Sequence, residues 1–234
     1  MHTSRQTGHA VDALPALDSG VTLLRGAESV GESKSGVQDR RTELAALALA
    51  ELDRRDGPVR WVDARNHVST HALTDGARRP RVLERVLVAR AFTAHQHHSL
   101  VRQLVADAAR PTALVVAPAV DDLYADEDLL TGEAERLRDA TLSTLHALAE
   151  ACDVPVLVTA SDDEIVAEYA HEELAVEETR FGPRFEGAGG ETTAYWSRGG
   201  WQTTVPYWVD IYGAVEATEA VETETEPALP EVIA

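Results

Sequence analysis

Lysine is nearly absent from this chain of 234 residues, since Lys34 is the only one among 21 basic residues. Cysteine is equally scarce: Cys152 stands alone, which excludes an internal disulfide. Long apolar runs are missing as well, because stretches such as 113–120 fall far short of the roughly 18 to 20 residues that span a bilayer. The chain also does not begin with the continuous apolar segment of a signal peptide. We therefore expect a cytoplasmic protein that makes no membrane contact.

Acid is abundant and spread along the whole chain, with 40 acidic residues and a formal net charge of -19. In dilute buffer such a charge repels itself, whereas in molar salt the Debye length falls to ~3 Å and the repulsion is screened. An acidic, lysine-poor surface is therefore typical of a halophilic host. The total charge says little about partners, because a local basic face can still bind DNA. The 44% of hydrophobic residues suffices for one compact domain with a tail.

Apolar strands and helices alternate along the first two thirds of the chain. We expect strands at 21–25, 59–63, 86–92, 113–118 and 155–159, and helices at 42–54, 94–110 and 133–152. This alternation favours an α/β fold with a parallel sheet covered by helices on both faces. After residue 161 we expect an acidic helical segment with Glu172 and Glu173 on solvated faces, then strands around 181–186 and 191–196. The expected divisions are a flexible segment 1–16, a domain 17–213 with a hairpin extension from about 179, and an acidic disordered tail 214–234.

A glycine-rich stretch lies between the first expected strand and helix, which is where phosphate-binding loops occur. Gly26 and Gly31 have the spacing of such a loop, but Glu32 occupies the position of the phosphate-binding lysine. In a second register, Arg41 and Thr42 take the Lys-Thr positions after a longer loop. An ordinary surface turn remains an equally good interpretation.

Three segments, WVDARNHVSTHAL at 61–73, VLERVLVARAFTAHQHHSLV at 82–101 and TGEAERLRDATLSTLHALAEACDVPVLVT at 131–159, resemble the archaeal RadA-type recombinases of the RecA superfamily. The resemblance extends over about residues 17–161. It implies a RecA-like three-layer sandwich, with a mostly parallel central sheet and helices on both faces, here with a C-terminal β-hairpin extension. The activity that it implies is DNA-dependent ATP hydrolysis, which drives filament assembly and strand exchange.

The positions that carry catalysis in that family are changed in this chain. Arg65 stands where the resemblance implies the glutamate that activates water, and Ala117 where it implies the aspartate that supports magnesium. Ala160 and Ser161 stand in place of an amide sensor. Because phosphoryl transfer depends on positioned charges, we expect no catalytic residues and no cofactor. ATP and Mg²⁺ are expected only if the degenerate loop of Gly26, Gly31, Arg41 and Thr42 still holds phosphate.

Two further groups could bind ligands. Residues 76–110 contain seven arginines against two acids. We predict nucleic-acid or partner contacts at Arg78, Arg79, Arg81 and Arg85, with pairing to acids elsewhere as the alternative. The run HQHH puts His95, His97 and His98 on different faces of one helix, so we interpret them as structural and expect no metal.

These features favour a non-catalytic RadA-like paralogue that acts as an accessory protein in DNA recombination and repair. Its expected partners are a catalytic RadA-type recombinase or other repair proteins, and DNA itself. One alternative is a divergent ATP-binding protein or weak DNA-dependent ATPase. Another is a regulatory scaffold unrelated to DNA, because a fold does not fix a function.

Overall fold

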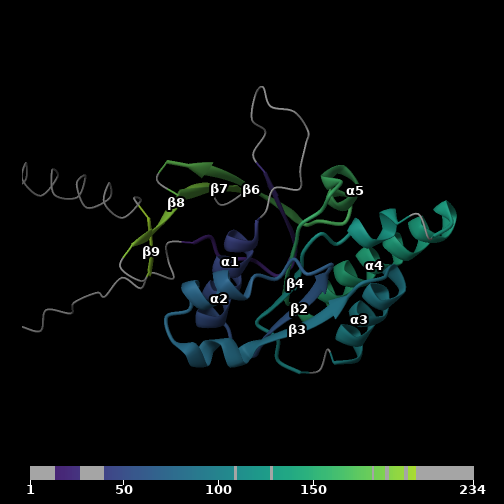
Figure 1. The fold of residues 1–234 in the computed structure, drawn as a ribbon, viewed down its shortest axis with the longest axis horizontal. Helices are drawn as coiled ribbons and strands as arrows, with labels where there is room; N and C mark the ends of the chain where they lie inside the picture. The colour runs from purple at the N-terminus through teal and green to yellow at the C-terminus, as the bar shows by residue number, and fades with distance from the viewer. Residues whose placement is uncertain are drawn as a thin grey trace, which may run out of the picture.

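Parallel strands form the centre of the molecule. A computed structural model describes residues 14–26, 40–107, 110–126, 129–180, 182–187, 190–197 and 200–203 (Figure 1). Its parallel strands are β1 (Gly20–Gly26), β2 (Val59–Ala64), β3 (Val86–Ala91), β4 (Leu114–Ala117), β5 (Pro155–Val158) and β6 (Glu172–Thr179). They lie in the order β3-β2-β4-β5-β1-β6, and β3 is at one edge. The expected α/β fold with a mostly parallel sheet is confirmed.

Helices cover both faces of these strands (Figure 1). On one face lie α1 (Arg41–Arg54), α2 (Thr70–Gly76) and the 3-10 helix η2 (Pro80–Arg85). On the other lie α3 (Ala94–Ala106), α4 (Thr131–Cys152) and α5 (Asp163–Ala167), while the short η3 (Asp122–Ala125) contacts α3 and α4. None of the described helices combines the length and the apolar character that crossing a membrane requires.

The central strands are apolar on both sides because each side meets a layer of helices. In β4, Leu114 and Val116 contribute to the core beneath α1, whereas Val115 and Ala117 contribute to the core beneath α4. All four residues are buried. Burying a side chain of this size contributes about 1.5 to 3 kcal/mol, so continuous apolar strands are both the sequence signal and the main source of stability here.

The segment 172–179 differs from the prediction. We expected an acidic helical segment with Glu172 and Glu173 on solvated faces, but these residues belong to β6, which pairs in parallel with β1. Leu174 and Val176 are buried while Glu173 and Glu177 are exposed, which is the period of two that a strand requires. Pairing with β1 and burial of two apolar side chains outweigh the helix propensity of the glutamates.

Beyond β6 the sheet continues with antiparallel strands. These are β7 (Gly182–Gly187), β8 (Gly190–Ser197) and β9 (Gly200–Thr203). Phe185 of β7 is buried against the same core as α1. At the other end, Leu14 is also buried and its carbonyl accepts a hydrogen bond from Arg54, so residues 14–16 of the segment expected to be flexible pack against the domain. The expected acidic tail 214–234 lies outside the described residues.

Candidate functional site

The carboxyl ends of β1, β2, β4 and β5 lie along one edge of the sheet because these strands are parallel. Open α/β sheets bind their ligands at this edge. Gly26 ends β1 here, and Arg41 and Thr42 begin α1. Gly31 lies outside the described residues. The structure therefore places both flanks of the degenerate loop, but not its centre.

Arg40 fixes the start of α1 to the end of β1. It is the N-cap residue, and its Nη1 donates a hydrogen bond of 2.9 Å to the Leu24 carbonyl. Burial lowers the pKa of Arg40, although Asp163 and Glu43 act against this shift. Burial likewise raises the pKa of Asp163, and Arg40 and Arg25 partly offset it. The Arg40 guanidinium is thus bonded to a backbone carbonyl at this edge, and the charge of Asp163 favours its protonated form.

Asp63 near the end of β2 is fully buried. Its Oδ1 accepts a hydrogen bond of 3.0 Å from the Val68 amide, and its Oδ2 accepts one of 2.9 Å from Nε of Arg90. Asp63 therefore fixes the turn that follows β2 and links that strand to β3. Its carboxylate is committed to the fold.

Arg65 occupies the position where the resemblance implies a water-activating glutamate. It has a φ of 52° and Asn66 has a φ of 71°, so a left-handed turn directs the chain away from the strand. The Nε of Arg65 lies 2.8 Å from Oδ2 of Asp122, and the same guanidinium also pairs with Asp126. A cation neutralised by two carboxylates cannot accept a proton from water.

Asp121 follows β4, four residues after the position where the resemblance implies a magnesium-binding aspartate. Its two oxygens accept hydrogen bonds of 2.8 Å each from the Ser161 and Asp162 amides after β5. Burial raises the pKa of Asp121, and the amide hydrogen bonds partly offset it. The carboxylate thus holds the loops after β4 and β5 together. We assign it a structural role.

The four candidate arginines fall into two kinds. Arg78, Arg79 and Arg81 are exposed, just before or within η2. Arg85 instead donates to the carbonyls of Leu52, Arg55 and Gly57 at distances of 2.8 to 3.0 Å, which holds the end of α1 against η2. We therefore restrict the candidate binding surface to the first three arginines.

Next to these arginines, β3 forms the edge of the sheet. Among the described strands it pairs only with β2. Leu87 and Val88 are 49% and 44% exposed on opposite faces of β3, and Phe92 just beyond it is 62% exposed. An exposed apolar edge strand with unpaired backbone groups is a template for pairing with another chain. The residues Arg78, Arg79, Arg81, Leu87 and Val88 are called the β3 surface below.

The three histidines of the HQHH run take separate roles. His97 is buried and its Nδ1 lies 2.9 Å from the hydroxyl of Tyr124, while His98 lies 3.0 Å from Thr141. His95 is exposed, with Glu133 3.6 Å away. Burial lowers the pKa of His97 to about 4, so this ring is neutral at physiological pH. No two of these three histidines lie where both could bind the same metal ion.

A pocket opens at the opposite edge, where β2, β4 and β5 begin. It is lined by Arg60, Thr112, Cys152 and Val154 among others. The guanidinium of Arg60 already contacts Asp107 at 3.1 Å and Thr112 at 3.1 Å. The guanidinium of Arg60 is therefore already engaged within the protein, and we assign the pocket no ligand.

One cluster was missed by sequence reasoning. His146 and Glu150 of α4 meet His171, which directly precedes β6. The spacing of four between His146 and Glu150 was a usable signal, since such residues share a helix face. The sequence around His171 gave no such signal, because this residue lies within the segment that we expected to be helical.

Comparison with known proteins gives no family for this chain. No protein-family model matches it, and no curated protein matches it either. Its function must therefore be argued from its motifs and from the contacts described above.

Proposed function

We propose that this chain is a non-catalytic relative of the RadA-type recombinases and acts as an accessory binding protein in DNA recombination and repair. In this proposal its core is a RecA-like three-layer sandwich and β7 to β9 form a C-terminal hairpin extension. The proposal rests on the three motif segments and is consistent with the mostly parallel sheet. The observation that carries the non-catalytic part is the pairing of Arg65 with Asp122 and Asp126.

Phosphoryl transfer needs a cation on the outer phosphates, a magnesium ligand and a group that orients the nucleophile. At the carboxyl edge, Arg40 is bonded to a carbonyl, Asp121 to two amides, and Asp63 to Arg90 and an amide. Each of these three charged groups is therefore hydrogen-bonded within the fold. Removing several elements of such a site together leaves no route to hydrolysis.

The docking part of the proposal rests on the β3 surface. An extended segment of a partner can add to the open edge of β3, with Leu87 and Val88 supplying apolar contacts on the two faces. The adjacent arginines favour an acidic partner. We propose a catalytic RadA-type recombinase from a halophilic host as this partner, because the salt argument that explains the acidity of this chain applies to its partner as well.

The first experiment is a titration of the full chain with ATP in molar KCl, with and without Mg²⁺, followed by a phosphate-release assay with DNA present. We expect neither saturable binding nor hydrolysis. Saturable, Mg²⁺-dependent binding would instead favour a divergent ATP-binding protein or a weak DNA-dependent ATPase.

The second experiment tests docking by measuring capture of a purified halophilic RadA-type recombinase. We expect capture by the wild type and at least tenfold weaker binding by Leu87→Asp. Leu130→Asp is the matched control, because Leu130 is an exposed leucine (78%) that precedes α4 and is not part of the β3 surface. Equal binding by both variants would refute docking at β3. Capture of neither recombinase nor DNA would favour a scaffold unrelated to DNA.

A further inference from the structure

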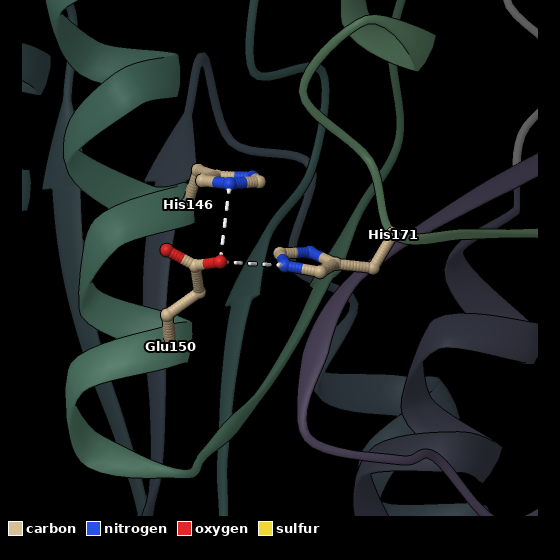
Figure 2. Close-up of side chains that lie close together, drawn as sticks. All are labelled: His146, Glu150 and His171. Carbon is tan, nitrogen blue, oxygen red and sulfur yellow. Dashed lines mark ion pairs between the residues drawn. The ribbon is translucent and has the colours of Figure 1, made fainter.

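Three potential metal ligands from separate parts of the chain meet on the side of α4 (Figure 2). His146 and Glu150 lie one helical turn apart, and His171 approaches from the segment before β6. The Nε2 atoms of both histidines lie 3.7 Å from Oε1 of Glu150. All three ligand atoms lie within 4.8 Å of one another, and each side chain is at least about a third exposed. The cluster is therefore accessible to an ion from solvent.

His146 is oriented as a metal-binding histidine would be. Its Nδ1 lies 2.8 Å from the carbonyl oxygen of Tyr169. Because a carbonyl can only accept, Nδ1 carries the proton and donates, which leaves the lone pair on Nε2 directed towards Glu150. A backbone carbonyl on the other ring nitrogen is the usual partner of a metal-ligating histidine, and it fixes both the tautomer and the ring.

His171 is held in a different way. Its ring stacks on that of His146, with centroids 4.3 Å apart and planes 13° from parallel. The amide of Val21 donates to its Nδ1 at 3.0 Å, so the ring proton of neutral His171 is on Nε2. Gly20 leaves room for this ring, since a Cβ there would lie 3.1 Å from it.

We propose that His146, Glu150 and His171 bind Zn²⁺ through two imidazole nitrogens and one carboxylate oxygen, with the fourth position open to water. Zinc takes such ligands at about 2.0 to 2.2 Å in tetrahedral geometry. This implies about 3.4 Å between ligand atoms, close to the 3.7 Å observed on two sides of the triangle. The required contraction is a few tenths of an ångström on those sides.

Binding requires one movement, which gives the proposal its most specific consequence. Because the stacked rings are nearly parallel, their Nε2 atoms point along similar directions and do not converge on one point. His171 must therefore turn for both Nε2 atoms to reach one ion. The same turn releases the Val21 amide, and the ring proton moves from Nε2 to Nδ1 as the metal takes its place. No proton is gained or lost by His171 in this exchange.

The proposed ion would connect α4 with the starts of β1 and β6. Val21 is the second residue of β1, at the end of the strand opposite to Gly26. The zinc site is therefore separate from the degenerate nucleotide edge and from the β3 surface. It does not depend on the proposed function, and either can fail alone.

The test is calorimetric titration of the full chain with Zn²⁺ in chelator-free, phosphate-free buffer. We expect one tightly bound ion per chain, and at least tenfold weaker binding by His146→Gln, Glu150→Gln and His171→Gln. The matched control is His71→Gln: His71 lies 2.7 Å from Asp75, four residues along α2, which is the same helical spacing outside this cluster. This control should bind as the wild type does.

A second measurement follows the amide resonance of Val21 in protein labelled with ¹⁵N-valine. Zn²⁺ should shift it in the wild type and in His71→Gln, but not in Glu150→Gln. Unchanged affinity in Glu150→Gln and His146→Gln would overturn the proposal. Unchanged affinity in His171→Gln alone would reduce the site to two ligands on α4 and overturn the role of His171. If His171→Gln does not fold, the affinities of His146→Gln and Glu150→Gln and the Val21 amide resonance still test the proposed zinc site.

Discussion

The arginines of this protein behave differently in two neighbouring regions. At the carboxyl edge of the sheet, Arg65 and Arg90 pair with carboxylates of adjacent segments. Before β3, Arg78 and Arg81 are exposed. All four lie in a chain with a large excess of acid, so the acid alone does not decide which arginines become structural. The deciding factor is the distance to a buried or fixed acceptor.

The largest effect is expected where an arginine neutralises a buried charge. Arg90→Ala leaves the fully buried Asp63 with only the Val68 amide as a partner. Breaking a buried pair costs about 3 to 5 kcal/mol, and we expect about 3 because Arg90 itself is partly exposed. Urea unfolding in molar KCl measures this loss. The control Arg102→Ala removes an exposed arginine of α3 and should change stability by less than about 0.5 kcal/mol. Equal effects would show that the Arg90 pair adds nothing.

The histidines of α3 show a similar contrast, since His97 is buried and His95 is exposed. Burial lowers the pKa of His97 to about 4, from an ordinary value of 6.5. The unfolded chain therefore binds a proton that the native state excludes between these values, and stability falls as pH is lowered from about 6.5 to 4. A shift of this size corresponds to about 3 kcal/mol.

This prediction is measured as a difference between the wild type and His97→Gln. The pKa values of Asp121 and Asp163 are raised in the folded protein. These two groups therefore change the stability in the opposite direction from His97, because their contribution to the stability of the fold is lost as pH rises through their titration. Their contribution cancels in the difference. His95→Gln is the exposed control and should keep the pH dependence of the wild type. A His97→Gln protein that loses stability on acidification as the wild type does would contradict the assignment.

Arg85 and Arg81 test the contrast within the arginine-rich stretch itself. Arg85→Ala removes the donors to the carbonyls of Leu52, Arg55 and Gly57 at the end of α1. We expect a loss of about 2 kcal/mol, because buried acceptors left unpaired cost about 1 to 3 kcal/mol. Arg81→Ala should cost less than about 0.5 kcal/mol but weaken capture of the recombinase. If Arg81→Ala lowers the stability more than Arg85→Ala does, the division of these arginines into a structural Arg85 and an exposed Arg81 is wrong.

The parallel core was predictable because both faces of its strands are buried. Val115 and Val116, for example, are apolar on successive positions, which is typical of a strand between two helical layers. The strand β6 was missed because only Leu174 and Val176 mark its period of two, among four glutamates. The strand conformation of this segment depends on its pairing with β1, which joins residues about 150 positions apart in the sequence.

The site was harder to predict than the fold for a similar reason. Nothing in the sequence distinguishes Arg85, which meets three carbonyls, from Arg81, which is exposed four residues earlier. Likewise, the sequence shows Arg65 at the position where the resemblance implies a catalytic glutamate, but it does not show the pairing of Arg65 with Asp122 and Asp126. That pairing depends on where the fold places η3 relative to the end of β2, which the sequence does not show.

The sharpest test of the proposed function is a substitution for which we expect only a small change in stability. Arg65→Glu restores an acid at the position where the resemblance implies the catalytic glutamate, and it places that acid beside Asp122 and Asp126. The lost ion pairs are partly exposed, so each is worth at most about 1 kcal/mol, and we expect a total loss of about 1 kcal/mol.

ATP hydrolysis should remain absent in Arg65→Glu, because Arg40 and Asp121 keep their hydrogen bonds to backbone groups. Arg65→Gln is the control that removes the cation without adding an acid. Phosphate release by Arg65→Glu alone, in molar KCl with Mg²⁺ and DNA, would mean that a single ion pair suppresses catalysis. The carboxyl edge would then be an intact nucleotide site held inactive, and the contrast between its paired charges and the exposed β3 surface would describe regulation instead of loss.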